Sequence, residues 1–200
     1  MATRAQASAQ RRRSILDAAL AAFLERGYDA TTIEDIRERS GASVGSLYHH
    51  FGGKEGITGA IYLEALAQYQ EGVMRALEST GSASTGITAM ARFHIRWITE
   101  HPDWARFLFR MRGAEGVRAV EAEIAQMNRR VFARVATWAE PHVRAGRLAR
   151  LPRDLFLLLC LGPAQEYGRL WLAGRTETPP HRAAPALADA AWRAVRGAKH

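Results

Sequence analysis

The sequence predicts an all-α fold of about nine helices, because apolar residues recur at three- and four-residue spacing in every segment after residue 16. No segment alternates apolar and polar residues as a half-buried strand does. The 200 residues are 48% hydrophobic, which is enough for one large domain or two small ones with a real core.

Glycine, proline and polar loops mark the ends of the predicted helices. The composition of residues 81–86, Gly-Ser-Ala-Ser-Thr-Gly, predicts a loop, and residues 176–180 predict a linker. In chain order, the predicted helices span residues 12–26, 32–40, 43–51, 54–79, 87–100, 102–111, 117–143, 153–173 and 183–196.

The first of these helices has a continuous apolar stripe and ends before Gly27. Gly52-Gly53 interrupts the chain before the helix that opens at Lys54, and Pro102 suits the first position of the helix it begins. The stripe of the first helix consists of Ile15, Ala18, Ala19, Ala22 and Phe23.

Two short helices joined by a tight turn are predicted within residues 32–51. Thr32 with Asp35 three positions later is an N-cap pairing, and Gly41 supplies the backbone freedom for a sharp reversal. Ser43 caps the second helix, in which Leu47 and Phe51 point toward the core. A helix-turn-helix of this kind places its second helix in the major groove of DNA.

The outward side of that second helix is small, polar and aromatic. Gly45 lowers helix stability, so its presence indicates a close approach to another molecule. The outward positions are Val44, Gly45, Ser46, Tyr48 and His49.

About a dozen positions at fixed spacing resemble the N-terminal signature of the tetracycline-repressor (TetR) family. The resemblance covers roughly residues 11–57, and the rest of the chain shares only length and helical pattern with the family. It implies an N-terminal helix-turn-helix DNA-binding domain, residues 1–54, and a helical ligand-binding and dimerisation domain, residues 55–200. The matching residues are Gly27-Tyr28, Thr31-Thr32-Ile33, Ile36, Ser40-Gly41, Ser43, Gly45, Leu47-Tyr48, Phe51 and Lys54-Glu55.

The resemblance also implies contacts to double-stranded operator DNA. Val44 can touch a thymine methyl group, and Ser46 is short enough for the helix to sit deep in the groove. Tyr48, His49 and Lys54 suit phosphates, which position a protein on DNA without reading sequence. The expected DNA-binding residues are Thr32, Ser43, Val44, Gly45, Ser46, Tyr48, His49 and Lys54.

Arg37 departs from the family pattern, which has a small residue at this position. Two outcomes are open: the Arg37 stem lies along the protein surface with its guanidinium in solvent or near phosphate, or the hairpin is splayed.

The net charge of +8 agrees with nucleic-acid binding but does not establish it, since most of the charge lies outside residues 1–56. Only the first sixteen residues are purely basic, with Arg4, Arg11, Arg12 and Arg13. This segment is either an arm that follows phosphates or a disordered tail.

The C-terminal half combines aromatic and soft side chains with a few polar ones, as small-molecule sites do. The alternative is an ordinary core, which such stripes form more often. The candidate ligand-binding residues are His94, Trp97, Phe107, Met111, Ile124, Met127, Asn128, Cys160, Glu166 and Tyr167.

The helix predicted at 153–173 is apolar on nearly every face, so it requires cover on every face. An alanine-rich helix at 183–196 permits close helix packing. Together they predict an intermolecular four-helix bundle in a homodimer, with ordinary core as the alternative. The expected interface residues are Leu158, Gly162, Leu187, Ala188, Ala191 and Val195.

Other classes are disfavoured. The single cysteine, Cys160, excludes an intrachain disulfide, and no apolar run approaches the roughly 20 residues of a membrane span. Neither a metal-ligand set nor a catalytic triad is supported by spacing. The sequence therefore predicts a cytoplasmic protein with no cofactor, no metal site and no enzymatic activity.

The expected function is a sequence-specific DNA-binding transcriptional regulator. A repressor released from its operator by a small apolar or aromatic effector is the leading form. An activator or a ligand-independent regulator is the alternative within regulation, and a nonspecific DNA-binding protein or an all-helical enzyme is the alternative from other classes.

Overall fold

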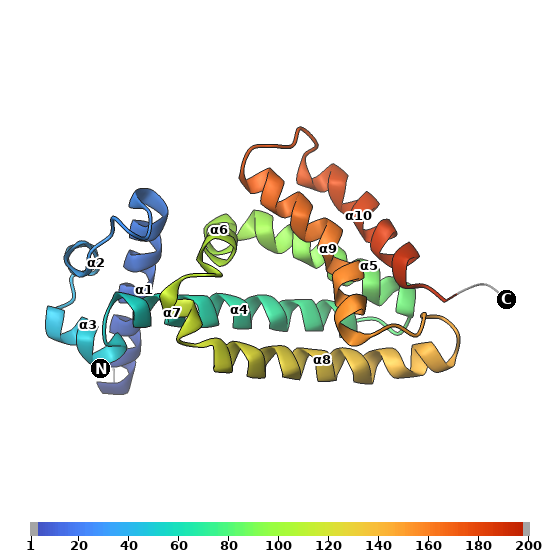
Figure 1. The fold of residues 1–200 in the computed structure, drawn as a ribbon, viewed down its shortest axis with the longest axis horizontal. Helices are drawn as coiled ribbons and strands as arrows, with labels where there is room; N and C mark the ends of the chain where they lie inside the picture. The colour runs from blue at the N-terminus through green and yellow to red at the C-terminus, as the bar shows by residue number, and fades with distance from the viewer. Residues whose placement is uncertain (1–3, 198–200) are drawn as a thin grey trace. The chain divides into compact units, whose positions relative to one another are not determined.

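Ten α-helices and no strand make up residues 4–197, the part of the chain that the computed structural model describes (Figure 1). This confirms the predicted all-α fold. An isolated antiparallel bridge pairs Leu148 with Arg196, just after the last helix. The helices are α1 (Arg4–Arg26), α2 (Ile33–Ser40), α3 (Val44–Phe51), α4 (Lys54–Glu78), α5 (Ala83–Glu100), α6 (Pro102–Met111), α7 (Glu115–Arg118), α8 (Glu121–Arg144), α9 (Arg153–Leu172) and α10 (Pro180–Val195).

The helices divide into two compact units. The first contains the residues up to Leu66 together with Asp103–Ile124. The second contains Ala67–Pro102 together with the residues from Ala125 onward. Helix α4 is continuous and contributes to both units, and α6 and α7 belong with the N-terminal helices. The functional division at residue 54 therefore remains a prediction that these structural units do not test.

The first unit has its own apolar core, in which the stripe predicted for the first helix is entirely buried. Helix α2 contacts both α1 and α3, and α4, α6 and α7 add further side chains to the core. The rings of Phe23 and Phe107 stack at 6.1 Å between centroids. The largest fully buried side chains of this core are Ile15, Leu16, Ile36, Leu47, Ile57, Ile61 and Phe107.

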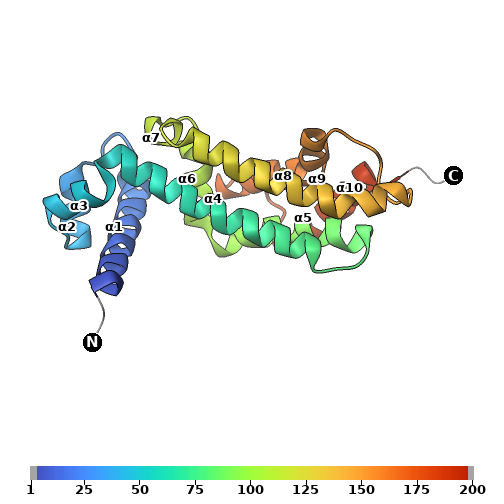
Figure 2. The same cartoon turned by 90° about the horizontal axis from the view of Figure 1, so that it is seen from below.

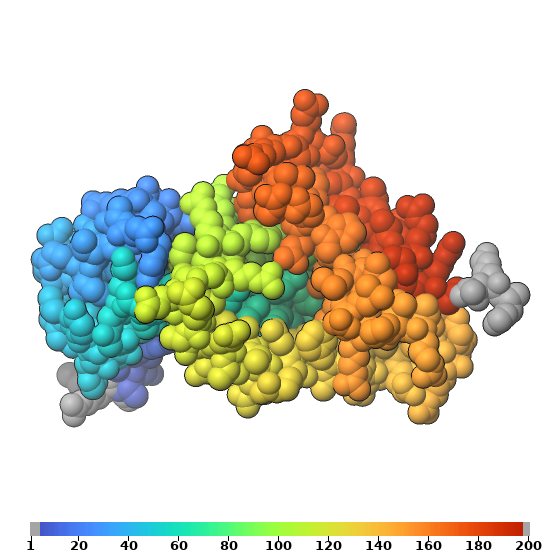
Figure 3. All heavy atoms as spheres, in the orientation of Figure 1, coloured from blue at the N-terminus to red at the C-terminus, as the bar shows by residue number. Residues whose placement is uncertain are grey.

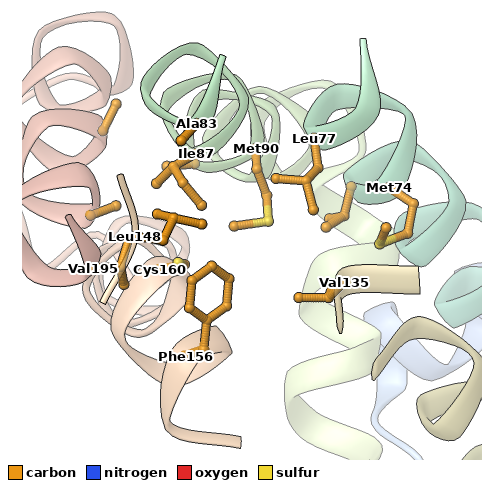
Figure 4. Packing of buried hydrophobic residues seen from close by; sticks show 14 residues of the cluster. Met74, Leu77, Ala83, Ile87, Met90, Val135, Leu148, Phe156, Cys160 and Val195 are labelled. Atoms are coloured by element: carbon orange, nitrogen blue, oxygen red, sulfur yellow. The ribbon is translucent and has the colours of Figure 1, made fainter. Parts of the chain in front are cut away.

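The second unit is built on mutual contacts of α5, α9 and α10. Helices α4 and α8 run side by side in both cartoon views (Figures 1 and 2). Arg134 of α8 binds Glu71 and Glu78 of α4 and ties the two helices together. The surfaces of α9 and α10, orange to red, meet in the space-filling view (Figure 3). Ile87, Met90, Val135, Phe156, Cys160 and Val195 converge in the core (Figure 4).

The predicted start of the first helix at residue 12 is wrong, because α1 begins at Arg4. Residues 4–11 are mostly alanine, glutamine, arginine and serine, which provide no apolar stripe but have no helix breaker either. Residues 1–3 of the predicted basic arm lie outside the described part of the chain.

The loop predicted at 81–86 is also wrong over most of its length. Ser82 caps α5 by accepting a hydrogen bond from the Thr85 backbone at 3.2 Å, so the helix starts at Ala83. Gly86 lies inside this helix, and Trp138 occupies the space beside it. A Cβ added at Gly86 would meet the Trp138 ring at 2.5 Å, so glycine is explained here by tertiary packing and not by a loop.

The single helix predicted at 117–143 is two helices, α7 and α8, separated at 119–120. Gly116 packs directly against the backbone of Glu55 in α4, which fixes α7 before the chain turns into α8. No glycine or proline marks the break itself.

Candidate functional site

The α2–α3 hairpin has the predicted caps. The Thr32 side chain accepts a hydrogen bond from the Asp35 backbone at 3.1 Å, while the Asp35 carboxylate accepts one from the Thr32 backbone at 2.8 Å. Gly41 adopts a left-handed conformation at φ 65°, and its N–H bonds the Arg37 carbonyl. The Ser43 side chain then accepts from the Ser46 backbone and starts α3. Local hydrogen bonds thus fix both helix starts and the turn between them.

Helix α3 has one buried and one exposed side. Leu47 is completely buried, whereas Val44 is 43% and Tyr48 53% exposed. Gly45 and His49 are exposed as well, and Ser46 is partly buried. Nothing lies within 4 Å of a Cβ placed on Gly45. The chain itself therefore does not require glycine here, and the outward face of α3 is free to enter a groove.

Lys54 does not project freely from the start of α4. Its ammonium donates hydrogen bonds to the carbonyls of Tyr28 and Thr31, both at 3.0 Å, and lies 4.4 Å from the centre of the Tyr28 ring. The charge remains next to the hairpin, but two of its three donors already have acceptors. Lys54 thus fastens the segment before α2 to α4, in addition to the phosphate contact expected of it.

We expect Lys54→Met to destabilise the protein by about 1.5–3 kcal/mol, because the substitution removes hydrogen bonds from a charged donor to two carbonyls. Urea unfolding followed by circular dichroism measures this. Lys54→Arg keeps the charge and is the control. Unchanged stability of Lys54→Met would show that these bonds contribute nothing in solution.

Two of the basic residues of α1, Arg12 and Arg13, are paired with acidic side chains of the first unit. Arg12 and Arg13 both form ion pairs with Glu64 of α4, and Arg13 also pairs with Asp17. The Arg13 guanidinium lies 5.5 Å from the centre of the Trp104 ring, while Arg11 is exposed. Residues 4–13 are helical and therefore not a disordered tail, while the phosphate-following role stays a prediction, with Arg11 exposed.

Arg37 does not prevent the hairpin from forming. Its guanidinium bonds Glu34 at 2.7 Å and lies 3.7 Å from Glu38, both on its own helix. Because the Gly41 turn and both caps are in place, the first of the two expected outcomes, a side chain lying along the surface, is the one observed.

The candidate ligand-binding residues do not form one group. Phe107, Met111 and Ile124 belong to the core of the first unit. Glu166 is exposed and bonds Arg169 on its own helix, and the Tyr167 hydroxyl donates to the Thr178 carbonyl at 2.7 Å. These two side chains have surface partners, because α9 directs Phe156, Cys160, Ala164 and Gly168 inward.

The second unit does bring His94, Trp97 and Cys160 inside, all at least 93% buried. Tyr69 of α4 contacts the first two: its hydroxyl lies 2.6 Å from His94 Nδ1, and its ring meets that of Trp97 at 5.1 Å. Asn128 accepts a hydrogen bond from Gln70 at 2.8 Å, and Met127 beside it is partly exposed. Burial raises the pKa of the Cys160 thiol to about 12, which makes it inert.

His94 is the unusual member of this group. Its Nε2 atom is buried and has no hydrogen-bond partner among the described residues. Desolvation lowers the pKa of His94 to about 4, so the ring is neutral at neutral pH. A buried donor or acceptor without a partner costs about 1–3 kcal/mol. The Tyr69–His94 pair was not predicted from the sequence, because the two residues are 25 positions apart on different helices.

The dimer-interface residues divide between surface and core. Leu158 is 64% exposed, Leu155 is 39% exposed, and no atom lies within 4 Å of a Cβ placed on Gly162. Leu187 is partly buried. Ala188, Ala191 and Val195 are buried in the core of the second unit, so the described chain does not present these side chains to a partner. The alanine stripe of α10 is used for close packing inside the chain.

Within residues 4–197, no group of three or more His, Cys, Asp and Glu side chains is placed to hold a metal ion. None of the described helices is both long enough and apolar enough to cross a membrane.

The helix-turn-helix region matches a known family. Residues 15–61 fit the sequence profile described as "Bacterial regulatory proteins, tetR family". The repressor KstR2 of Rhodococcus jostii strain RHA1 is 40% identical over 82 residues, 39% of this chain and 40% of that protein. The repressor AcnR of Corynebacterium glutamicum is 39% identical over 60 residues, 30% of this chain and 32% of that protein. The chain thus spans about two fifths or less of these curated relatives.

Solved structures share the whole fold. A TetR-family transcription regulator from Marinobacter aquaeolei VT8 superposes with a TM-score of 0.76 at 18% identity, covering 96% of this chain and 99% of that one. A tetR-family bacterial regulatory protein from Rhodococcus RHA1 superposes with a TM-score of 0.75 at 23% identity, covering 94% of this chain and 98% of that one. Residues 15–61 thus match the tetR family of bacterial regulatory proteins, and the fold as a whole is similar to solved structures of such regulators.

Proposed function

We propose that this protein is a sequence-specific DNA-binding transcriptional regulator that acts as a homodimer, represses transcription from its operator and is released by a small, mainly apolar effector. The observation that carries the proposal is the exposed outer face of α3, with Val44 and Tyr48 projecting from a helix whose inner residue Leu47 is completely buried. A rigidly supported short helix with an unfilled outer face suits the major groove.

The proposed dimer follows from the geometry of DNA. Two recognition helices must lie about one helical turn apart, roughly 34–36 Å, to read successive major grooves. Leu155, Leu158 and the open surface at Gly162 on α9 offer apolar area for the second protomer. Repeated half-sites in the operator are therefore expected.

Release by an effector needs a structural connection between the DNA-binding helices and the effector site. Helix α4 begins at Lys54, which bonds the segment directly before the hairpin, and continues to Tyr69, whose hydroxyl contacts His94. An effector that favours one tilt of α4 would change the separation of the recognition helices. The coupling is limited by the difference in effector affinity between the two states, typically 1–3 kcal/mol or about 5- to 150-fold in operator binding.

Selection of duplexes from a random pool, followed by footprinting beside the protein's own gene, tests the proposed function. A sharp two-half-site footprint supports regulation, and equal affinity for all duplexes would support a nonspecific DNA-coating protein. Transcription assays with the selected operator separate a repressor from an activator. An enzyme would require convergent ionisable groups at a cavity, and the hydrogen bond described for His94 is to the Tyr69 hydroxyl.

Val44→Ala should relax preference at one base pair in each half-site and cost about 1–3 kcal/mol against the best operator, because it shortens the apolar contact to a base edge. Competition binding with single-base operator variants measures this. Arg11→Ala is the control: it should weaken all duplexes alike and lower the salt slope by about one unit. The assigned roles would be reversed if Arg11→Ala altered sequence preference and Val44→Ala did not.

A further inference from the structure

The Tyr69–His94 pair has a defined proton arrangement. Burial raises the pKa of the Tyr69 hydroxyl, so it stays protonated and needs an acceptor. His94 Nδ1, at 2.6 Å, is the acceptor that the structure provides. A neutral imidazole carries one proton, so when the Tyr69 hydroxyl donates to Nδ1 that proton is on Nε2. In this tautomer the second unit holds a buried N–H donor, Nε2–H, that has no acceptor among the described residues.

The side chains packed around Tyr69 are aromatic, and the basic residues Arg96 and His101 lie against the outer rings, Phe93 and Trp97. The Tyr69 ring contacts those of Phe93, His94 and Trp97 at centroid distances of 5.1–6.4 Å. Trp97 and His94 are buried, and Tyr69 is partly exposed. The contacts described for this pair include no charged group that could balance an anion.

We propose that His94 Nε2–H is the polar contact of the effector site, and that the effector is a neutral, largely apolar or aromatic molecule whose carbonyl or similar oxygen accepts this hydrogen bond. The inference rests on the proposed release by an effector and names the ligand chemistry. A carboxylate is disfavoured, because it would enter an apolar site without a counter-charge. A hydrocarbon is disfavoured, because it would leave the donor unpaired.

Three probes of matched size test this chemistry: acetophenone, benzoate and ethylbenzene. They are titrated into the full-length protein without DNA, and the imidazole nitrogens of His94 are followed by nuclear magnetic resonance. We expect the Nε2–H tautomer in the free protein, a downfield shift of its proton with acetophenone, at least tenfold weaker binding of ethylbenzene, and no response to benzoate.

Substitutions separate a binding role from a structural one. His94→Phe with Tyr69→Phe removes both members of the pair, so neither group is left unpaired. We expect this double variant to remain folded and at least as thermally stable as the wild type, while acetophenone binding falls to the level of ethylbenzene. His142→Phe is the control, since His142 is also a buried histidine of this unit but already contacts Arg147, and it should leave acetophenone binding unchanged.

Four results would overturn the proposal: an Nδ1–H tautomer, a buried water cross-relaxing with the Nε2 proton, benzoate binding as tightly as acetophenone, or no response of His94 to any probe at millimolar concentration. Operator binding is measured separately. If acetophenone binds at His94 and the operator is unaffected, the site stands and effector release fails. If the protein binds no DNA, the regulatory function fails while the His94 results still decide the site.

Discussion

Replacing Gly116 with alanine should destabilise the protein by about 1–3 kcal/mol, the usual cost of forcing extra atoms into a well-packed site. A Cβ at Gly116 would lie well under 3.0 Å from the Glu55 carbonyl oxygen at the start of α4. That oxygen belongs to the backbone and cannot rotate away. From the other side, a Cβ at Gly59 would meet the Gly116 carbonyl oxygen at 2.8 Å. The α7–α4 contact is therefore made between backbones, and any side chain separates them.

The effect should reach DNA binding. Glu55 follows Lys54, which fastens the segment before α2 to α4, so displacing α7 should disturb the support of the hairpin that follows this segment. Thermal unfolding should show a Tm lower by roughly 2–4 °C for each kcal/mol in a chain of this length. Operator titration should show weaker binding to all duplexes.

Gly113→Ala is the matched control for Gly116→Ala. Gly113 is exposed three residues earlier, and nothing lies within 4 Å of a Cβ placed there. Its stability should stay within about 0.5 kcal/mol of the wild type. Equal stability of the two variants would mean that the backbone contact of α7 with α4 does not exist in solution.

The hairpin could be predicted because local chemistry determines it. Thr32, Asp35, Gly41 and Ser43 set two helix starts and one turn through hydrogen bonds within a few residues. The same residue types elsewhere led to errors. Gly86 resembles a loop residue, yet it is inside α5 because Trp138 lies against it. A sequence alone does not distinguish a glycine kept for a turn from one kept for close packing.

The predicted effector and dimer residues fall partly in the core and partly on the surface, because helical spacing identifies an apolar face but not the element that covers it. On α10, Ala188, Ala191 and Val195 form the stripe that an interface would need, but α5 and α9 of the same chain cover it. The Tyr69–His94 contact joins two helices, and nothing in either helix alone indicates it.

Leu158→Glu should give a monomer with about 10²- to 10⁴-fold weaker operator binding, since two linked DNA-binding domains gain affinity by about this factor over a single one. Leu158 is 64% exposed on α9, so the carboxylate costs the isolated chain little. In a dimer built on this face, two carboxylates related by symmetry would lose water and repel each other. Light scattering with an operator titration measures both effects, and circular dichroism should show an unchanged helical fold.

Two further variants make the Leu158 result specific to its surface. Ala133→Glu, at an exposed position on α8, should remain dimeric with full operator affinity. Ala188→Glu should unfold the second unit instead of splitting the dimer, because Ala188 is only 1% exposed and would bury an unpaired charge. Two results would show that the α9 face does not join two protomers: a wild type that is a monomer at micromolar concentration with full operator affinity, or a Leu158→Glu variant that stays dimeric. The DNA-binding domains would then need another means of reaching two half-sites.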